Sequence, residues 1–270
     1  MYSEFTGKSG NLREILTRLS NGKITVSEAQ KEISIFSIES VGDNLAKIDI
    51  SRDIRKLTPE VILSEGKDSK DVIRIALSVL AKRNLVVISR IKEPNSSVIH
   101  SSLKRKGFVV EVGSKSSTIL VSKKNSLQIS NTTKPTIGIL AAGTSDIGVA
   151  EECRLIAKAM GCGCLTSYDV GIAGIHRLFP KLKEMVYFDV STIIVVAGME
   201  GALPSVVSSL VDIPVIAVPT STGYGFGSNG AAALGTMLQS CSLGLAVVNI
   251  DNGIGAGAFA ATIARRRVKM

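Results

Sequence analysis

The fold is decided by the stretch that begins PTIGILAAGTSD at Pro135 and runs to Gly255. It contains five short apolar runs, rich in Val, Ile and Ala, and each run ends in a polar loop that contains glycine. The loops span residues 142–146, 168–171, 197–201, 219–223 and 249–253. Buried parallel strands read as continuous apolar runs, and open α/β sheets bind ligands at the carboxyl ends of their strands. We therefore expect reactive side chains to gather at one edge of one sheet, as they do in an enzyme.

Alternating strand and helix patterns in the second half predict a doubly wound parallel sheet in three flavodoxin-like layers. The strands are expected at 136–142, 164–168, 192–197, 215–219 and 246–251, and the helices at 146–160, 172–184, 202–210, 229–240 and 258–267. The first half predicts a smaller α/β domain. Its helices are expected at 11–22, 27–36, 70–83 and 97–106, with Ser27 as an N-cap, and its strands at 45–50, 60–63, 85–91, 108–112 and 118–121.

Charge and glycine divide the chain into two predicted domains, 1–134 and 135–270. The first holds 23 Lys and Arg against 14 Asp and Glu, whereas the second holds 9 of each and 18 of the 25 glycines. A basic half invites a nucleic-acid partner. Its positive charges are scattered among acids, however, and aromatic residues make up only 4% of the chain. Solvated helix faces near an anionic small molecule are therefore expected, and no nucleic acid.

The four cysteines form no CxxC pair and no disulfide framework. The polar start of the chain has no apolar signal segment, and no apolar run is long enough to span a membrane. These features predict a protein of the reducing cytoplasm without a membrane partner.

Two polar loops of the second half supply candidate ligand-binding residues. The loop at 143–146 follows the first strand and opens a helix, which favours an anion. Asp146 either caps that helix or binds a ligand, and the residues alone leave both alternatives open. His176, beside Arg177, contacts an anion, acts as an acid or base, or is a partly buried structural histidine. With two histidines in the chain, a site of several histidines around a metal is excluded.

Two further residues have the chemistry of a base and a nucleophile. Glu200 stands where the third strand turns into its helix, and it either complements the helix dipole or acts as a general base. Cys241 precedes the last strand and is either a small buried thiol or a nucleophile. The glycines at 223–227 resemble a dinucleotide fingerprint only superficially, and no P-loop occurs. The hydroxyl-rich loop 220–225 is nevertheless placed to wrap a substrate.

In this order, the loops resemble the aminoimidazole ribonucleotide carboxylase family, with GTSD at 143–146, GIHR at 174–177 and AGME at 197–200. Longer stretches narrow the resemblance to the LarB family of nickel pincer cofactor biosynthesis proteins: DVGIAGIHR at 169–177, GMEGALPS at 198–205, PTSTGYG at 219–225 and NIDNG at 249–253. The first half also follows that family's pattern, with Leu57-Thr58 in place of the usual Gly-aromatic pair. The matching positions there are Asp49, Arg52, Arg55, Pro59 and Glu60.

This resemblance implies a carboxylase and hydrolase that acts on nicotinic acid adenine dinucleotide, with CO2 or bicarbonate as co-substrate. The products are pyridinium-3,5-biscarboxylic acid mononucleotide, a precursor of the nickel pincer cofactor of lactate racemase, and AMP. The resemblance assigns Cys241 as the nucleophile, Glu200 as a base and His176 as a ligand of CO2 or the new carboxylate. It also implies Mg²⁺ at Asp146 and a homo-oligomer, since relatives of this fold form octamers. The residues expected to bind the substrate are Thr144, Ser145, Asp146, Arg177, Ser221, Tyr224, Arg52 and Arg55.

Two other functions are compatible with parts of the sequence. A carboxylase or mutase of purine biosynthesis fits the second-half loops, but it needs neither the basic first half nor Cys241. A non-catalytic nucleotide-binding regulator that meets DNA would use the basic half, but no helix-turn-helix signature is present. Both are therefore less favoured than the carboxylase acting on the dinucleotide.

Overall fold

The computed structural model describes residues 8–34, 38–41, 46–49, 58–126 and 135–267. Its second half contains a five-stranded sheet in the order β11-β10-β9-β7-β8. All neighbouring strands are parallel. The strands are β7 (Thr136–Ala141), β8 (Gly163–Ser167), β9 (Ile193–Ala197), β10 (Val215–Pro219) and β11 (Leu245–Val247). This is the flavodoxin order, which reverses direction between β7 and β9, and it confirms the predicted fold class.

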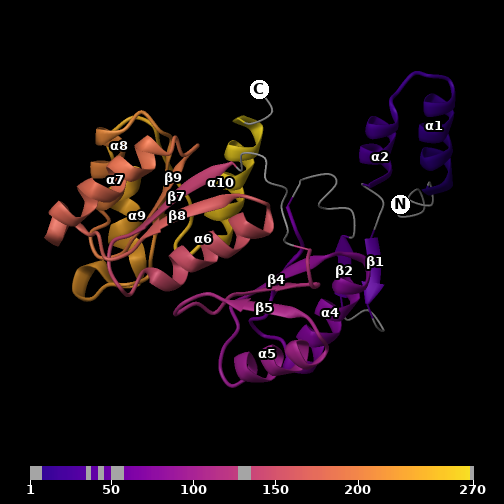
Figure 1. Ribbon diagram of the computed structural model, residues 1–270, viewed down its shortest axis with the longest axis horizontal. Helices are drawn as coiled ribbons and strands as arrows, with labels where there is room; N and C mark the ends of the chain where they lie inside the picture. The colour runs from indigo at the N-terminus through magenta and orange to yellow at the C-terminus, as the bar shows by residue number, and fades with distance from the viewer. Residues whose placement is uncertain (1–7, 35–37, 42–45, 50–57, 127–134, 268–270) are drawn as a thin grey trace, which may run out of the picture.

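Helices cover both faces of this sheet (Figure 1). One face packs against α6 (Ile147–Ala159) and α10 (Gly253–Arg267), and the other packs against α7 (Leu178–Tyr187), α8 (Leu203–Leu210) and α9 (Ala231–Leu238). Because both faces are covered, alternate side chains such as Ile139 and Leu140 enter different cores and are both fully buried. Gly257 lets α10 approach α6 closely, since a Cβ there would lie 2.5 Å from the Cys153 carbonyl oxygen.

The first half contains a smaller mixed sheet in the order β3-β4-β6-β5. Its strands are β3 (Val61–Leu63), β4 (Leu85–Ser89), β5 (Val109–Val112) and β6 (Ile119–Ser122). The β3–β4 pair is parallel, whereas β6 is antiparallel to both β4 and β5. The helices α4 (Ser69–Lys82) and α5 (Asn95–Arg105) pack on one face. This arrangement is the small α/β domain that the sequence predicts.

The other face of the small sheet packs against α6. Val87 of β4 and Leu120 of β6 share one apolar core with Ile156 of α6 and with strands of the large sheet. The helix therefore lies between two sheets, one from each half of the chain (Figure 1).

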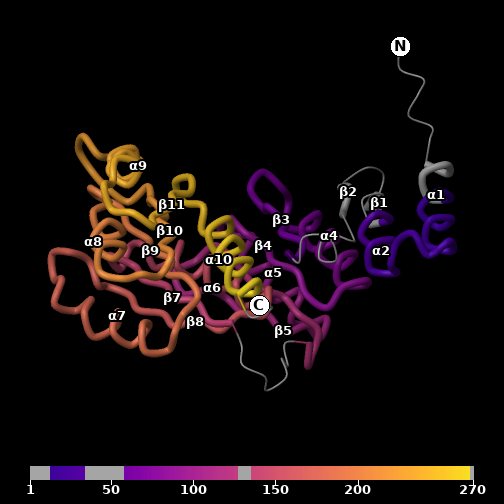
Figure 2. The backbone as a smooth tube through the Cα atoms, turned by 90° about the horizontal axis from the view of Figure 1, so that it is seen from above, coloured from indigo at the N-terminus to yellow at the C-terminus, as the bar shows by residue number. Residues whose placement is uncertain are grey.

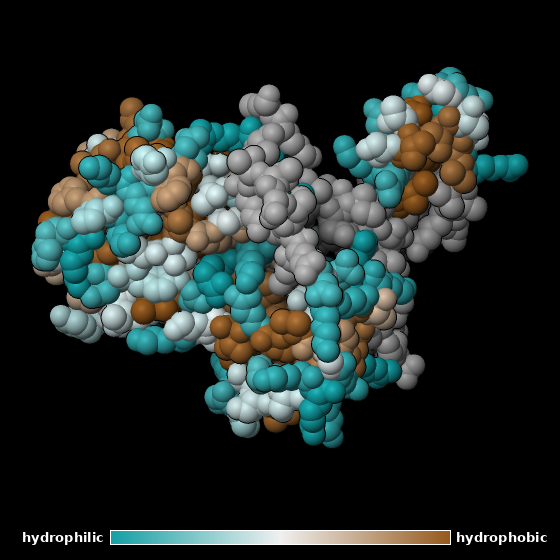
Figure 3. Space-filling model, in the orientation of Figure 1, coloured by the Kyte–Doolittle hydropathy of each residue, from teal (hydrophilic) through white to brown (hydrophobic). Residues whose placement is uncertain are grey.

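A helical pair and a hairpin precede the small domain. They are α1 (Lys8–Ser20), α2 (Val26–Ser34), β1 (Ile38–Val41) and β2 (Ala46–Asp49). Figure 2 shows the α1–α2 pair at the far end of the molecule from α8. Apolar surface is visible on this pair in Figure 3, and Leu16 and Val26 are 48% and 72% exposed.

Two local predictions from the sequence were wrong, namely the N-cap of the second helix and the length of the last strand. The N-cap of α2 is Thr25 rather than Ser27, because the Thr25 hydroxyl accepts a hydrogen bond from Glu28 N while the Glu28 carboxylate accepts one from Thr25 N. Strand β1 was not predicted. The segment 172–184 is mostly helical, as predicted, and it begins as a 3₁₀ segment, η1 (Ile172–Arg177), in which Gly174 is non-helical. The last helix begins at Gly253, so the strand before it is shorter than predicted.

Candidate active site

The loops at the carboxyl ends of the large sheet are joined to one another by hydrogen bonds. Gly171 N donates to the Ala142 carbonyl over 2.8 Å, which joins the loops after β8 and β7. Met199 N donates to the Thr222 carbonyl over 2.8 Å, which joins the loops after β9 and β10. Ser221 N donates to Asp251 Oδ1 over 2.9 Å and so adds the segment after β11. The predicted convergence of these loops at one sheet edge is therefore observed.

Asp146 is the buried centre of this edge, with an exposed fraction of 4%. Its Oδ2 accepts a hydrogen bond from Gly143 N over 2.8 Å, and its Oδ1 accepts one from the Thr220 hydroxyl over 2.7 Å. Burial raises the pKa of this carboxyl, although the donors from Thr220 and Gly143 act in the opposite direction. Asp146 occupies the N-cap position of α6 but makes no capping hydrogen bond with its side chain. It instead ties the loop after β7 to the loop after β10.

The hydroxyl residues beside Asp146 face solvent. Thr144 and Ser145 are both exposed, and the Thr144 carbonyl accepts a hydrogen bond from Lys115 Nζ over 3.4 Å. Ser221 and Tyr224 are also exposed, and the side chain of Tyr224 lies in the open with an exposed fraction of 79%. Arg52 and Arg55 lie outside the described residues.

The turn after β9 presents Glu200 to solvent. Met199 has a φ of 53° and Gly201 a φ of 68°, so the turn needs left-handed backbone on both sides of Glu200. Glycine is required at position 201 for a second reason, because a Cβ there would lie 2.8 Å from Ala233 Cα. The carboxylate of Glu200 is thereby exposed beside the point where the strand order reverses.

His176 and Arg177 end η1, and both side chains are exposed. Arg177 forms an ion pair with Asp169, which follows β8 and has a φ of 60°. His176 is thus an exposed histidine near the sheet edge rather than a partly buried structural one.

Cys241 is the only exposed thiol of the four cysteines. Burial raises the pKa of Cys153, and it raises the pKa values of Cys162 and Cys164 to about 11 and about 12. Cys162 and Cys164 pack in the apolar core around α6, whereas the buried alternative for Cys241 is wrong.

The segment that contains Cys241 is fastened to α8. Ser205 in the first turn of α8 donates its hydroxyl to Ser240 Oγ over 2.8 Å, and the Ser242 hydroxyl donates to the Ser205 carbonyl over 3.0 Å. Cys241 precedes the amino end of β11, whereas Asp146 and Glu200 follow the carboxyl ends of their strands. The structure of the single chain therefore does not bring Cys241 into contact with Asp146.

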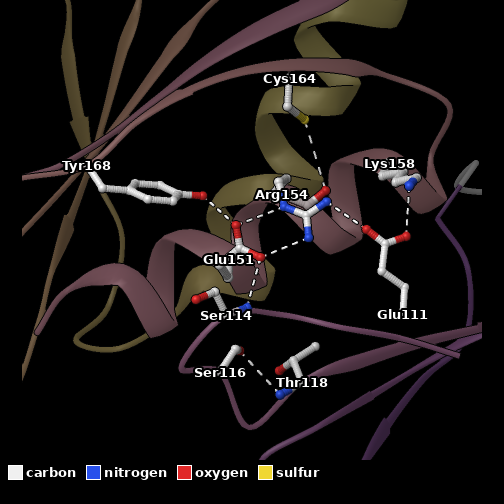
Figure 4. Close-up of polar contacts among 9 residues, drawn as sticks. All are labelled: Glu111, Ser114, Ser116, Thr118, Glu151, Arg154, Lys158, Cys164 and Tyr168. Atoms are coloured by element: carbon white, nitrogen blue, oxygen red, sulfur yellow. Dashed lines mark hydrogen bonds and ion pairs between the residues drawn. The ribbon is translucent and has the colours of Figure 1, made fainter. Parts of the chain in front are cut away.

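A polar network joins α6 to the small domain (Figure 4). Arg154 donates to both oxygens of Glu151 and, over 2.7 Å, to Glu111 of β5. Lys158 also donates to Glu111, while Glu151 accepts hydrogen bonds from the Tyr168 hydroxyl and, over 3.1 Å, from Ser114 N. Burial acts to raise the pKa of Glu151, but the donors outweigh it, so this pKa lies below its usual value.

The next residue of α6 has the opposite environment. Glu152 Oε1 accepts hydrogen bonds from the Thr118 hydroxyl over 2.8 Å and from the Ser89 hydroxyl over 3.3 Å. These donors are neutral, and burial raises the pKa of Glu152 above its usual value. Two adjacent carboxyls of one helix therefore differ in the direction of their pKa shifts.

The sequence did not single out several residues that build this site. Thr220 and Asp251 lie in loops that were expected to hold ligands, so the position after a buried strand was the available signal. Lys115 and Glu151 gave no such signal, because their partners lie in the other half of the chain. Among the described residues, no group of three or more His, Cys, Asp or Glu side chains is gathered as a metal site. No helix of the described chain has the length and apolarity to cross a membrane.

Comparison with known proteins agrees with this two-part architecture. Residues 136–269 match the family model described as AIR carboxylase, and residues 38–124 match the LarB/PurE-like N-terminal domain. A protein of Methanocaldococcus jannaschii that is described as uncharacterized is 46% identical over 258 residues, which cover 94% of this chain and 97% of its own.

Two shorter similarities concern purine enzymes. An N5-carboxyaminoimidazole ribonucleotide mutase of Methanocaldococcus jannaschii is 33% identical over 129 residues, which cover 47% of this chain and 77% of the mutase. A probable N5-carboxyaminoimidazole ribonucleotide mutase of Methanothermobacter thermautotrophicus is 31% identical over 134 residues, which cover 48% of this chain and 38% of that protein.

The fold and the loop edge define a carboxylase-type α/β enzyme. The chain belongs to the LarB-like family, in which a LarB/PurE-like N-terminal domain precedes an AIR carboxylase domain.

Proposed function

We propose that this enzyme carboxylates the pyridinium C5 of nicotinic acid adenine dinucleotide and hydrolyses its phosphoanhydride, giving pyridinium-3,5-biscarboxylic acid mononucleotide and AMP for nickel pincer cofactor biosynthesis. The observation that carries the proposal is the single exposed thiol, Cys241, in a chain that joins an AIR carboxylase domain to a LarB/PurE-like domain. Carboxylation of aminoimidazole ribonucleotide needs no thiol, because that ring already has an electron-rich carbon.

The pyridinium chemistry requires a nucleophile that is also a good leaving group. A thiolate of Cys241 adds at C4, which converts the electrophilic ring to a dihydropyridine whose C5 is enamine-like. C5 then attacks CO2, a base removes the C5 proton, and expulsion of the thiolate restores the aromatic ring. Cysteine suits both thiolate steps better than serine does. No redox partner is needed, because the electron pair that the thiolate adds to the ring leaves with the thiolate in the last step of the reaction.

The exposed polar residues of the loop edge fit the other roles. Glu200 is proposed as the base that removes the C5 proton, and His176 as the group that holds CO2 or the new carboxylate. Because Cys241 of the same chain lies at the amino end of the strands, the proposal requires that the thiol reach this edge from a second copy in the proposed homo-oligomer. Thr144 and Ser145 are proposed to bind ribose and phosphate. These assignments are supported by the exposure of the four side chains near the point where the strand order reverses, because open α/β sheets bind ligands there. Water then cleaves the phosphoanhydride, releasing AMP.

Magnesium fits poorly as a ligand of Asp146 alone. Both carboxylate oxygens already accept hydrogen bonds, and burial raises the pKa of this carboxyl. Mg²⁺ usually combines one or two carboxylates with substrate phosphates. No step of the proposed mechanism therefore passes through a metal, and Asp146 is proposed to shape the loop 143–146.

Mass spectrometry of the products tests the proposal after incubation with nicotinic acid adenine dinucleotide and bicarbonate, with and without Mg²⁺. The expected products are AMP and a mononucleotide that is heavier by one CO2 unit. Carboxylation of aminoimidazole ribonucleotide instead would assign the chain to purine biosynthesis, and salt-dependent DNA binding without either product would favour a regulator. Light scattering of the same preparation tests the proposed homo-oligomer.

Substitution of Cys241 tests the nucleophile. We expect Cys241→Ser to lose carboxylation by at least about a hundredfold, because an alkoxide is both harder to form and slower to leave. Cys164→Ser is the matched control, since it makes the same atomic change at a thiol with a raised pKa. Near-normal carboxylation by Cys241→Ser would remove the thiolate from the mechanism.

A further inference from the structure

Lys115 of the small domain contacts the loop 143–146 of the other half of the chain. Lys115 lies in the turn between β5 and β6, and its Nζ is 3.4 Å from the Thr144 carbonyl oxygen. Thr144 belongs to the loop after β7, in the other half of the chain. A cation from the small domain therefore stands beside the exposed hydroxyl residues that are proposed to bind phosphate.

The turn is built so that the backbone of Lys115 is held in place. Ser114 N donates to Glu151 of α6, and Ser116 N closes the turn on the Gly113 carbonyl over 3.1 Å. The backbone of Lys115 has a φ of 53°, which is unfavourable for lysine. It also packs against Gly148 of α6, where a Cβ would lie 2.6 Å from the Lys115 carbonyl oxygen. The turn is thus seated against the first turn of α6.

The ammonium group itself has weak contacts. In the part of the chain that the structure describes, its one hydrogen bond is the long one to Thr144, no carboxylate forms an ion pair with it, and the side chain is exposed. By contrast, Arg154 and Lys158 of the same interface are both paired with Glu111. A positive charge held at this edge without a protein counter-ion suits an anionic ligand.

We propose that Lys115 is a substrate-binding residue by which the small domain contacts a phosphate group of a nucleotide at the loop 143–146. The inference rests on the proposed function, since the nucleotide is that of its dinucleotide substrate. Lys115 adds a mobile ammonium to the hydroxyls of Thr144 and Ser145, and so a site that spans both halves of the chain binds the phosphate. The basic first half then serves the small-molecule substrate rather than nucleic acid.

The test is the Kd for AMP, measured by titration calorimetry at low and high ionic strength, which requires no turnover. We expect Lys115→Ala to weaken binding about tenfold at low salt, and Lys115→Arg to keep it within about threefold because the charge remains. The loss should shrink at high salt, since interactions of exposed charges are screened. The control is Lys124→Ala, which removes an exposed lysine at the opposite end of the β5–β6 hairpin and should leave the Kd unchanged.

The outcomes decide between a ligand contact and a structural role. The proposal is overturned if wild-type protein does not bind AMP, if Lys115→Ala and Lys124→Ala behave alike, or if the loss is independent of salt. If AMP binding depends on Lys115 but the dinucleotide gives no carboxylated product, the proposed function is refuted and the phosphate-binding role of Lys115 is retained. Product formation with an unchanged AMP Kd in Lys115→Ala would refute the site and leave the function.

Discussion

Replacement of Thr220 by valine removes the hydrogen bond that fastens Asp146 to the loop after β10. Valine keeps the shape of threonine but has no hydroxyl, so Asp146 Oδ1 loses its donor at 2.7 Å. Thr220 and Asp146 are 1% and 4% exposed, so water does not readily replace the donor. A buried acceptor left without its partner costs about 1–3 kcal/mol. Because this acceptor belongs to a carboxyl group, we expect a loss of about 2 kcal/mol in the free energy of unfolding.

The loss should also depend on pH. Burial raises the pKa of Asp146, and the hydroxyl of Thr220 opposes that shift by favouring the ionised form. Without the hydroxyl the pKa rises further, so Thr220→Val is penalised most when Asp146 is ionised. As pH falls through the pKa of Asp146, the carboxyl becomes protonated and the deficit of Thr220→Val relative to wild type should shrink.

Urea unfolding of wild type, Thr220→Val and Thr220→Ser measures this effect. Serine keeps the hydroxyl and removes one methyl group, which costs about 0.8 kcal/mol. The free energy of unfolding of Thr220→Ser should therefore lie between those of wild type and Thr220→Val, and it should keep the pH dependence of wild type. Equal losses in the valine and serine variants, or a deficit in Thr220→Val that does not change with pH, would refute the argument that this hydrogen bond holds the edge together.

Two further predictions concern the adjacent carboxyls of α6. Glu152→Gln keeps an oxygen to accept from Thr118 and Ser89 but removes the buried charge. The pKa of Glu152 is raised in the folded state, so wild type loses stability as pH rises from the unfolded pKa of 4.5 through the folded pKa. Urea unfolding at neutral pH should therefore find Glu152→Gln at least as stable as wild type. A clear loss at neutral pH would show that the ionised form is needed. Arg154→Met should cost about 3–5 kcal/mol near neutral pH, because Glu151 is left buried without its main counter-ion. The pKa of Glu151 is lowered in the folded state, so the stability from this ion pair is present above pH 4.5 and is lost as pH falls. Urea unfolding should therefore show a smaller deficit of Arg154→Met in acid. A deficit below about 1 kcal/mol at neutral pH would mean that water replaces the lost counter-ion of Glu151.

The large sheet was predictable because its strands are continuous apolar runs that end in glycine-bearing loops. Such runs occur when both faces of a strand are buried, as in β9, where all five residues are buried. Helix ends were less predictable, because they depend on single hydrogen bonds. Thr25 and Ser27 are both residue types that suit an N-cap, and the reciprocal hydrogen bonds between Thr25 and Glu28 favour Thr25.

The site was predicted as a set of loops, but the roles within it needed the structure. Whether Asp146 caps a helix could not be read locally, since its partner Thr220 is 74 positions away along the chain. The opposite pKa shifts of Glu151 and Glu152 could not be predicted from the sequence either. Both are glutamates on one helix, and their pKa directions differ because one meets Arg154 and the other meets hydroxyl groups.

The position of α6 suggests why a carboxylase domain of this family has a second domain. The helix follows the loop 143–146, with Asp146 at its N-cap position, and further along it contacts the small domain through Glu151, Glu152 and Arg154. It lies between two sheets and shares a core with both, so a shift of the small domain must move α6 or break these contacts. Among the described contacts, α6 and the turn that contains Lys115 both link the first half of the chain to the loop 143–146. Because the ion pair with Glu111 lies farther along the helix than the Lys115 contact, the two routes can be separated by substituting Glu111 and Lys115 independently.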